Sequence, residues 1–206
     1  ANAEYRAHFE RPCVGLIAND RPKVFEAVLA ALLPFKVRLA NTEIVTAGTA
    51  ADHKVIFKIP ERGIRFQFGA EEYSFFREGA SWSTVAEDTQ VLVAAERALL
   101  EGSGASVDSC MLTIWMHLQP LVKTPEEILA PFVPAPFKAF MTQRGQLTFG
   151  NHLEWADGDL LLDFSDSFAN GIFMRLRSQF KGQAPLADIL AKVRSDEEAV
   201  FGILGI

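Results

Sequence analysis

A strict alternation of apolar and polar residues over Ile64–Phe68 gives the first structural prediction for this chain. Successive side chains of a strand point to opposite faces, so this pattern predicts a strand with one buried and one exposed face. Gly69–Glu72 then has the composition of a turn, and Tyr73–Arg77 is predicted to be the returning strand. The two segments together predict a β-hairpin.

After this hairpin the apolar spacing becomes helical, and Thr84–Glu101 is predicted to be a long amphipathic helix. We expect Thr84 and Glu87 to form a capping box at its start and Gly102 to end it. The predicted apolar stripe consists of Val85, Thr89, Leu92, Val93, Leu99 and Leu100. Because this stripe and the apolar face of the hairpin can bury each other, we expect the helix to cover one face of a sheet.

The same two periodicities organise the rest of the first half. Residues 1–9 are expected to form a loose N-terminal arm, and Cys13–Ile17 a short apolar strand. Asp20 and Pro22 are typical of a helix start, and the apolar stripe that follows ends before Pro34. Further strands are predicted at Lys36–Leu39 and Glu43–Val45, interrupted around Asn41, and at His53–Ile59 before a turn at Pro60–Gly63.

The second half repeats this order. Thr124–Glu127 predicts a helix start, because a capping residue is followed by proline and then by two acids that suit the positive end of the helix dipole. The prolines Pro131, Pro134 and Pro136 are expected to end that helix in an irregular connection. A final helix is predicted at Pro185–Phe201, with a break at the capping box Ser195–Glu198. Strands are predicted at Met111–Gln119, Gln146–Trp155, Leu160–Phe164 and Ile172–Phe180.

These elements predict an α+β fold of two tandem β-α-β-β-β-α units, with an antiparallel sheet backed on one face by the long helices. The units are expected at residues 1–102 and 103–206, joined by a linker at Gly102–Gly104 and packed as one pseudo-symmetric body. We expect a true duplication; the alternative is that a simple element order recurs by chance. The order resembles that of the saddle-shaped TATA-box-binding core and, less well, of the helix-grip fold. This likeness is one of order without a motif, so it implies no function.

Two cysteines test this arrangement. In a pseudo-symmetric body the first strands of the two units could pair at the centre of the sheet, which would bring Cys13 close to Cys110. We favour the alternative of two independent buried thiols in a reducing compartment.

Composition and charge narrow the function. Hydrophobic residues make up 49% of the 206-residue chain, which is ample for a core, and 17 of its residues are Phe. The net charge of −6 and the pI near 5.3 argue against phosphate binding, so we expect no nucleic-acid partner. No apolar run approaches the roughly 18 residues of a membrane span, and no signal peptide is visible. We expect a cytoplasmic protein, although a mature secreted chain is also compatible with the sequence.

Patterns of known catalytic and cofactor sites are missing. The four histidines lack metal-binding spacing, and neither dinucleotide nor P-loop glycine patterns occur. His152 and Glu154 share a predicted strand face, but Asp157 and Asp159 in the next segment are ordinary turn residues. Ser165 lacks a nucleophile elbow, and no histidine is predictably beside it. We therefore predict no catalytic residue, no metal site and no cofactor.

Polar side chains on strands are the best candidates for binding. Arg65 and Gln67 share one strand face, as do Arg175 and Arg177 on another strand, and His117 lies on an apolar strand that could orient a ligand. Guanidinium groups pair with carboxylates and stack on rings, so an arginine row could contact a partner. The alternative is the ordinary wet face of an antiparallel sheet, with His117 as a hydrogen-bonded structural residue.

We expect a non-catalytic binding or assembly protein that binds a protein partner through an exposed sheet face or apolar groove. The alternative is a small apolar-ligand-binding protein or an enzyme, with a cavity between sheet and helix. Its predicted lining is Phe57, Phe66, Phe68, Phe149 and Phe173. The oligomeric state is not predicted.

Overall fold

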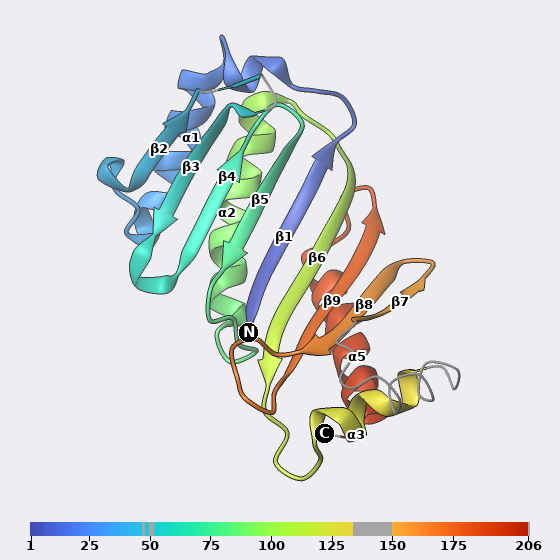
Figure 1. Cartoon of the computed structure of the whole chain (residues 1–206). Coiled ribbons are helices and arrows are strands. Elements are labelled where there is room, and N and C mark those ends of the chain that lie inside the picture. The colour runs from blue at the N-terminus through green and yellow to red at the C-terminus, as the bar shows by residue number, and fades with distance from the viewer. Residues whose placement is uncertain (47, 50–51, 134–149, 206) are drawn as a thin grey trace. The chain divides into compact units, whose positions relative to one another are not determined.

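The computed structural model describes residues 1–46, 48–49, 52–133 and 150–205 and has an α+β fold (Figure 1). Its nine strands form an antiparallel sheet in the order β2-β3-β4-β5-β1-β6-β9-β8-β7. The strands are β1 (Asn2–Phe9), β2 (Thr42–Val45), β3 (Lys54–Ile59), β4 (Ile64–Phe68), β5 (Glu72–Arg77), β6 (Val107–Leu118), β7 (Asn151–Trp155), β8 (Gly158–Phe164) and β9 (Ile172–Lys181). The α-helices of the described residues are α1 (Arg21–Leu32), α2 (Val85–Ser103), α3 (Pro125–Leu129) and α5 (Leu186–Leu204). The α+β class and the antiparallel sheet confirm the sequence prediction.

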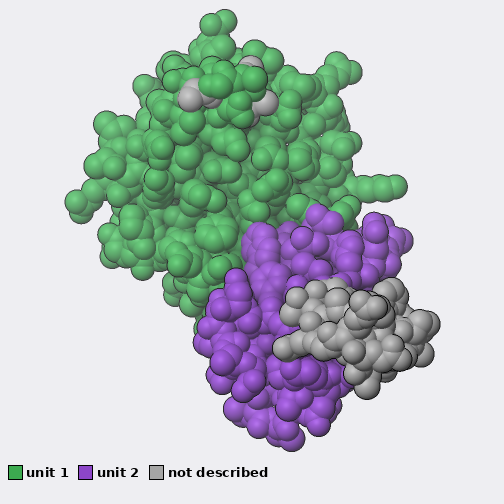
Figure 2. Space-filling model, viewed as in Figure 1, with its two compact units in different colours: residues 1–112, 179–186 green, residues 113–178, 187–206 purple. Residues whose placement is uncertain are grey.

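Two compact units divide the chain (Figure 2). Unit 1 comprises Ala1–Leu112 and Gln179–Leu186, and unit 2 comprises Thr113–Ser178 and Ala187–Ile206. The boundary predicted at residue 102 separates two repeats of one element order. A division by compactness does not test such a repeat, so this boundary stays a prediction. Among the described residues no helix is long and apolar enough to cross a membrane.

The core of unit 1 follows from the alternation along its strands. In β4 the side chains of Ile64, Phe66 and Phe68 are buried, whereas Arg65 between them is exposed. Phe66 pairs with Phe57 of β3, whose ring stacks at 5.3 Å on Phe25 of α1. Each such buried side chain stabilises the fold by about 1.5–3 kcal/mol relative to an exposed one. Figure 1 shows α1 and α2 on one side of strands β2 to β5.

Helix α2 confirms the predicted helix but corrects its ends. Gly102 lies inside the helix, and Gly104 ends it with a left-handed φ of 66° while its N–H donates to the carbonyl of Leu100. Glycine adopts that φ at little cost, which is why the stop falls there. The predicted linker at Gly102–Gly104 is therefore wrong. The capping box is also wrong, because Thr84 makes no side-chain cap and its hydroxyl donates to Asp88 at 3.1 Å.

The buried stripe of α2 differs from the predicted one. Leu92 and Leu99 are buried as expected, but Val93 is 43% exposed. The helix buries Asp88, Val91, Leu92, Ala95 and Leu99. The carboxylate of Asp88 therefore lies among the apolar side chains of this stripe.

Asp88 is only 7% exposed and is neutralised by two arginines. Its carboxylate accepts from Arg77 Nε of β5 at 2.9 Å and from Arg62 Nη2 at 2.7 Å. A buried carboxylate is tolerated only when it is paired and hydrogen-bonded. This ion cluster fastens the first turn of α2 to the end of β5 and to the turn between β3 and β4, which contains Arg62.

The helix predicted after Asp20 is confirmed as α1, but the two predictions for residues 1–17 were wrong. Residues 2–9 form β1, which pairs with β5 in a register that places Tyr5 opposite Phe75. Tyr5, Ala7 and Phe9 are buried, so the period of a half-buried strand was present, although Ala7 is a weak strand former. Cys13–Ile17 is not a strand, because Val14–Ile17 is a 3-10 turn. Other 3-10 turns lie at Leu33–Phe35, Leu39–Asn41, Pro60–Arg62 and Ala130–Phe132, and the first of the two strand pieces predicted before His53 is absent.

The two cysteines are unpaired, which agrees with the favoured alternative. Cys110 is buried at 2% exposure, whereas Cys13 is partly exposed, so only one of them is a buried thiol. Desolvation raises the pKa of both thiols, which favours their protonated form at neutral pH.

In unit 2 the start of α3 matches its prediction. Thr124 and Glu127 form a capping box, in which each backbone N–H donates to the other side chain at 2.8 and 3.2 Å. Helix α5 is continuous through Ser195–Glu198, so the predicted break there is wrong. Its apolar positions remain in phase across that segment, and packing outweighs the local capping signal. Residues 146–149 of a predicted strand, and Pro134 and Pro136, lie outside the described residues.

Candidate functional site

One face of strand β9 in unit 2 collects polar and aromatic side chains. Met174 and Leu176 point to the buried face, at 0% and 1% exposure, so Phe173, Arg175 and Arg177 share the opposite face. The arginine side chains are 29% and 33% exposed. Opposite them on β8 the register pairs Asp159 with Arg177, which places that carboxylate on the same face.

Asp159 joins the two arginines. Its Oδ1 accepts from Arg175 Nη2 at 3.0 Å and its Oδ2 accepts from Arg177 Nε. His152 Nε2 on β7 lies 3.4 Å from the same Oδ1. Asp159 is 1% exposed although it belongs to the polar face, so the guanidinium groups are fixed by a carboxylate that water does not reach.

The pKa of Asp159 reflects two opposed effects. Desolvation by burial raises it, but the hydrogen bonds and positive charges of Arg177 and Arg175 outweigh burial and lower the pKa below its ordinary value. The carboxylate is therefore ionised at neutral pH and holds both arginines.

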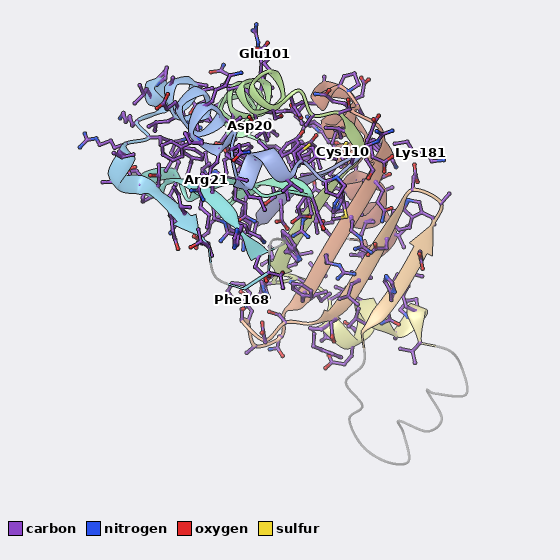
Figure 3. All side chains as sticks on the ribbon, turned by 90° about the horizontal axis from the view of Figure 1, so that it is seen from above. Asp20, Arg21, Glu101, Cys110, Phe168 and Lys181 are labelled. Carbon is purple, nitrogen blue, oxygen red and sulfur yellow. The ribbon has the colours of Figure 1, made fainter. Side chains whose placement is uncertain are left out.

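His117 of β6 lies at the aromatic end of the same face. Its ring centroid is 5.2 Å from that of Phe173 and 6.2 Å from that of Phe168. Figure 3 shows Phe168 in the loop between β8 and β9. We call His117, Phe168, Phe173, Arg175 and Arg177 the arginine face.

The structure also places His117 beside Ser165, a contact that no sequence pattern predicts. Ser165 Oγ lies 2.8 Å from His117 Nδ1 and accepts the backbone N–H groups of Ser167 and Phe168 at 3.1 and 3.0 Å. Because Ser165 Oγ accepts both N–H groups, its hydroxyl hydrogen is free to donate to His117 Nδ1. The neutral imidazole then carries its proton on Nε2. The carboxylate of Asp166 approaches the same nitrogen, with Oδ1 3.8 Å from Nδ1.

This pair differs from a catalytic Ser-His arrangement. An activated nucleophile needs a base that a third group orients through its other ring nitrogen. Here no carboxylate of the described residues holds Nε2 directly: Nε2 lies 3.5 Å from Ser167 Oγ, which donates to Asp166 Oδ1 at 3.0 Å. Ser165 Oγ also accepts two backbone N–H groups and so closes a turn. The geometry supports a structural role for Ser165 and a fixed orientation for His117.

Arg65 and Gln67 lie in unit 1 and form a separate group. They share one face of β4, and Arg65 stacks over the ring of Phe76 at 5.2 Å. Gln67 is opposite Ser74 of β5, whose buried hydroxyl has no hydrogen-bond partner among the described residues. The structure therefore brings Arg175 and Arg177 together with His117 nearby in unit 2, and Arg65 with Gln67 in unit 1.

Asp159 is the site residue that sequence reasoning missed. It was assigned to the turn around Gly158, but β8 begins at Gly158, so Asp159 is a strand residue. Its cross-strand position opposite an arginine was the available signal, although it required knowing the register.

The residues predicted to line an apolar cavity fall in different parts of the chain. Phe57, Phe66 and Phe68 pack in the core of unit 1, Phe173 belongs to unit 2, and Phe149 lies outside the described residues. Unit 2 has an open pocket of about 490 Å³ at the end of β6. It is lined by Leu118, Gln119, Pro120, Leu121, Val122, Lys123, Phe201 and Gly205. Leu121 and Val122 are 98% and 95% exposed there.

No group of three His, Cys, Asp or Glu side chains in the described parts of the chain could hold a metal ion.

The Asp159→Asn variant tests the pairing. A carboxyl whose folded pKa is lowered contributes stability above its unfolded pKa, about 3.9, and that contribution is lost as the pH falls through the folded value. We expect the variant to lose about 1–2 kcal/mol of unfolding free energy at pH 7. The difference in unfolding free energy between wild type and variant should shrink below about pH 4. Urea unfolding at a series of pH values measures this. The exposed neighbour Glu154→Gln should change stability by less than about 0.5 kcal/mol.

Comparison with known proteins identifies no family. No protein-family model matches the chain, and no curated protein matches it. A solved structure that it resembles is the di-domain ARO/CYC BexL from the BE-7585A biosynthetic pathway, at 10% sequence identity and a TM-score of 0.23. That match covers 99% of this chain and 97% of the other. At this TM-score the likeness carries no argument about fold or function.

Proposed function

We propose that this chain is a non-catalytic binding or assembly protein that binds a protein partner through the arginine face of unit 2. The observation that carries the proposal is the buried Asp159, which fixes two partly exposed guanidinium groups beside aromatic side chains. Arginine and aromatic residues are enriched among the residues that dominate binding energy at protein interfaces.

Preorganisation strengthens this reading. A free arginine side chain loses rotamer freedom when it binds, at a cost of about 0.5–1.5 kcal/mol. Asp159 has already restricted Arg175 and Arg177, and the hydrogen bond to Ser165 has restricted His117. A partner would therefore meet a face whose side chains are largely in place.

We also infer that the chain consists of two tandem units, each with a long helix against its sheet. The strand order supports this, because β3-β4-β5-β1 and β6-β9-β8-β7 mirror each other. Helices α2 and α5 are both 19 residues long, and Glu96 and Glu197 occupy the same position in them. Each helix also hydrogen-bonds to a strand residue: Glu96 accepts from Tyr73, and Asp196 accepts from Ser178 at 3.0 Å.

Two free cysteines support a reducing compartment, so we propose a cytoplasmic location.

A small apolar ligand is the alternative, and the open pocket at the end of β6 is the observation in its favour. Its volume of about 490 Å³ falls in the range of small-molecule sites. Among its described lining residues only Lys123 is charged, and it already donates to the carbonyl of Leu204 at 3.3 Å. Few polar groups are left to orient a ligand, which favours the protein-binding proposal.

Native mass measurement of the tagged chain, purified from its source organism, tests the proposal. A neutral variant carries Asp159→Asn, Arg175→Gln and Arg177→Gln together, which removes the charges while keeping polar side chains of similar size. We expect a protein partner to be retained by the wild type and reduced at least tenfold in the neutral variant.

The control changes the other candidate face, with Arg65→Gln and Gln67→Ala in unit 1, and should retain the partner. Retention of a mass of a few hundred daltons in place of a protein would support the ligand alternative. A partner that the neutral variant retains in full would contradict the proposal.

A further inference from the structure

We propose that the arginine face recognises a single carboxylate of an extended partner segment, together with an aromatic or large apolar side chain two residues away. This inference rests on the proposed function and names the chemistry of the partner.

Unused hydrogen-bond donors are the first support. Arg177 reaches Asp159 through Nε, and its two terminal nitrogens have no hydrogen-bond partner among the described residues. Arg175 uses Nη2, and its Nε, which also has no partner among the described residues, is buried and therefore not accessible to a partner. Both oxygens of Asp159 accept hydrogen bonds from the arginines. The two arginines and this one carboxylate together have a net charge of +1, and N–H groups of the arginines stay unused. A carboxylate matches the planar fork of a guanidinium with two parallel hydrogen bonds.

The surrounding charges argue for one carboxylate. Glu154 lies on the same sheet face, opposite Asp159, and Asp163 lies opposite Phe173. Asp166 lies in the loop beside His117. These acids would repel a run of acidic residues, whereas one carboxylate placed over Arg175 and Arg177 is attracted by the two guanidinium groups. An apolar or aromatic neighbour suits the other end of the face.

The spacing comes from the strand. Phe173 and Arg175 are alternate residues of β9, so they lie about 7 Å apart along it. An extended partner segment has the same repeat between alternate side chains. Its aromatic group would rest against Phe173 and His117, whose rings already contact each other, while its carboxylate meets the guanidinium groups.

Two peptides test the inference directly on the full chain. The probe is acetyl-Phe-Ser-Asp-amide, and its matched control is acetyl-Phe-Ser-Asn-amide, which has the same shape without the charge. Titration is followed by the backbone amide signals of Phe173–Arg177 in ¹⁵N NMR spectra. We expect millimolar binding of the aspartyl peptide and at least tenfold weaker binding of the asparaginyl peptide.

Variants assign the effect to the arginines. Arg177→Gln should abolish the preference for the aspartyl peptide, while Arg175 still pairs with Asp159 and keeps the fold intact, as the spectrum itself reports. Arg194→Gln, an exposed arginine of α5 paired with Glu198, should leave the preference unchanged.

Three results would each overturn the inference. They are equal binding of the two peptides, an unchanged preference in Arg177→Gln, and no signal change at about 10 mM peptide, which is on the order of the weakest affinities worth measuring. The proposed function fails separately. A protein partner that is lost on Phe168→Ala but retained by Arg177→Gln would keep the proposed function and reject the carboxylate, whereas the absence of any protein partner would reject the function.

Discussion

Replacing Asp88 by alanine is expected to lower the free energy of unfolding by about 3 kcal/mol. Its carboxylate is the common partner of Arg62 and Arg77, and the Arg77 side chain is only 15% exposed. Without Asp88 a largely buried guanidinium loses its counter-charge, which costs far more than the loss of a surface ion pair. The first turn of α2 also loses the contact that fastens it to Arg62 and Arg77.

Glu87→Ala is the matched control for Asp88→Ala. Glu87 is the preceding residue and lies 3.6 Å from the same arginine, Arg62, but its side chain is 76% exposed. An exposed ion pair contributes about 0–1 kcal/mol, so this variant should remain near the wild type. Urea unfolding followed by circular dichroism measures both. Similar losses for the two variants would show that burial does not govern this cluster.

Replacing Leu99 by alanine is the second change with a large expected effect, a loss of about 2–5 kcal/mol. Leu99 is 0% exposed on α2, so truncation removes apolar contacts and leaves a cavity that the surrounding core can fill only in part. The expected consequence is a lower midpoint of thermal and urea unfolding with an unchanged fold.

Val93→Ala provides the comparison, because the sequence pattern placed Val93 and Leu99 on one stripe. Val93 is 43% exposed, so its truncation should cost less than about 0.5 kcal/mol. Equal losses for the two variants would mean that the predicted stripe, and not the observed one, faces the core.

The elements that the sequence predicted well are those whose neighbours in space are also neighbours along the chain. Ile64–Phe68 and the following strand form a hairpin, and their alternation is decided locally. The errors concern distant partners. Strand β1 contains Arg6 and His8, and it is a strand because it pairs with β5, some seventy residues later. Asp88 is buried because Arg62 of the turn between β3 and β4 and Arg77 of β5 neutralise it.

The candidate site was predictable to a similar extent. Alternation along one strand placed Arg175 and Arg177 on one face, and the structure agrees. Their partner Asp159 could not be chosen, because a shift of the β8–β9 register by one residue would move its side chain to the opposite face. The contact between His117 and Ser165 depends on the loop after β8, whose course no periodicity predicts.

The division of the chain into units has a consequence for its synthesis. Gln179–Leu186 belongs to unit 1 although the preceding 66 residues, 113–178, belong to unit 2. The contacts of this segment within unit 1, such as the hydrogen bond from the Gly182 N–H to the carbonyl of Asp108, can therefore form only after residue 182 has left the ribosome. Unit 1 lacks this segment while residues 113–178 are being synthesised, so it cannot be completed strictly in chain order.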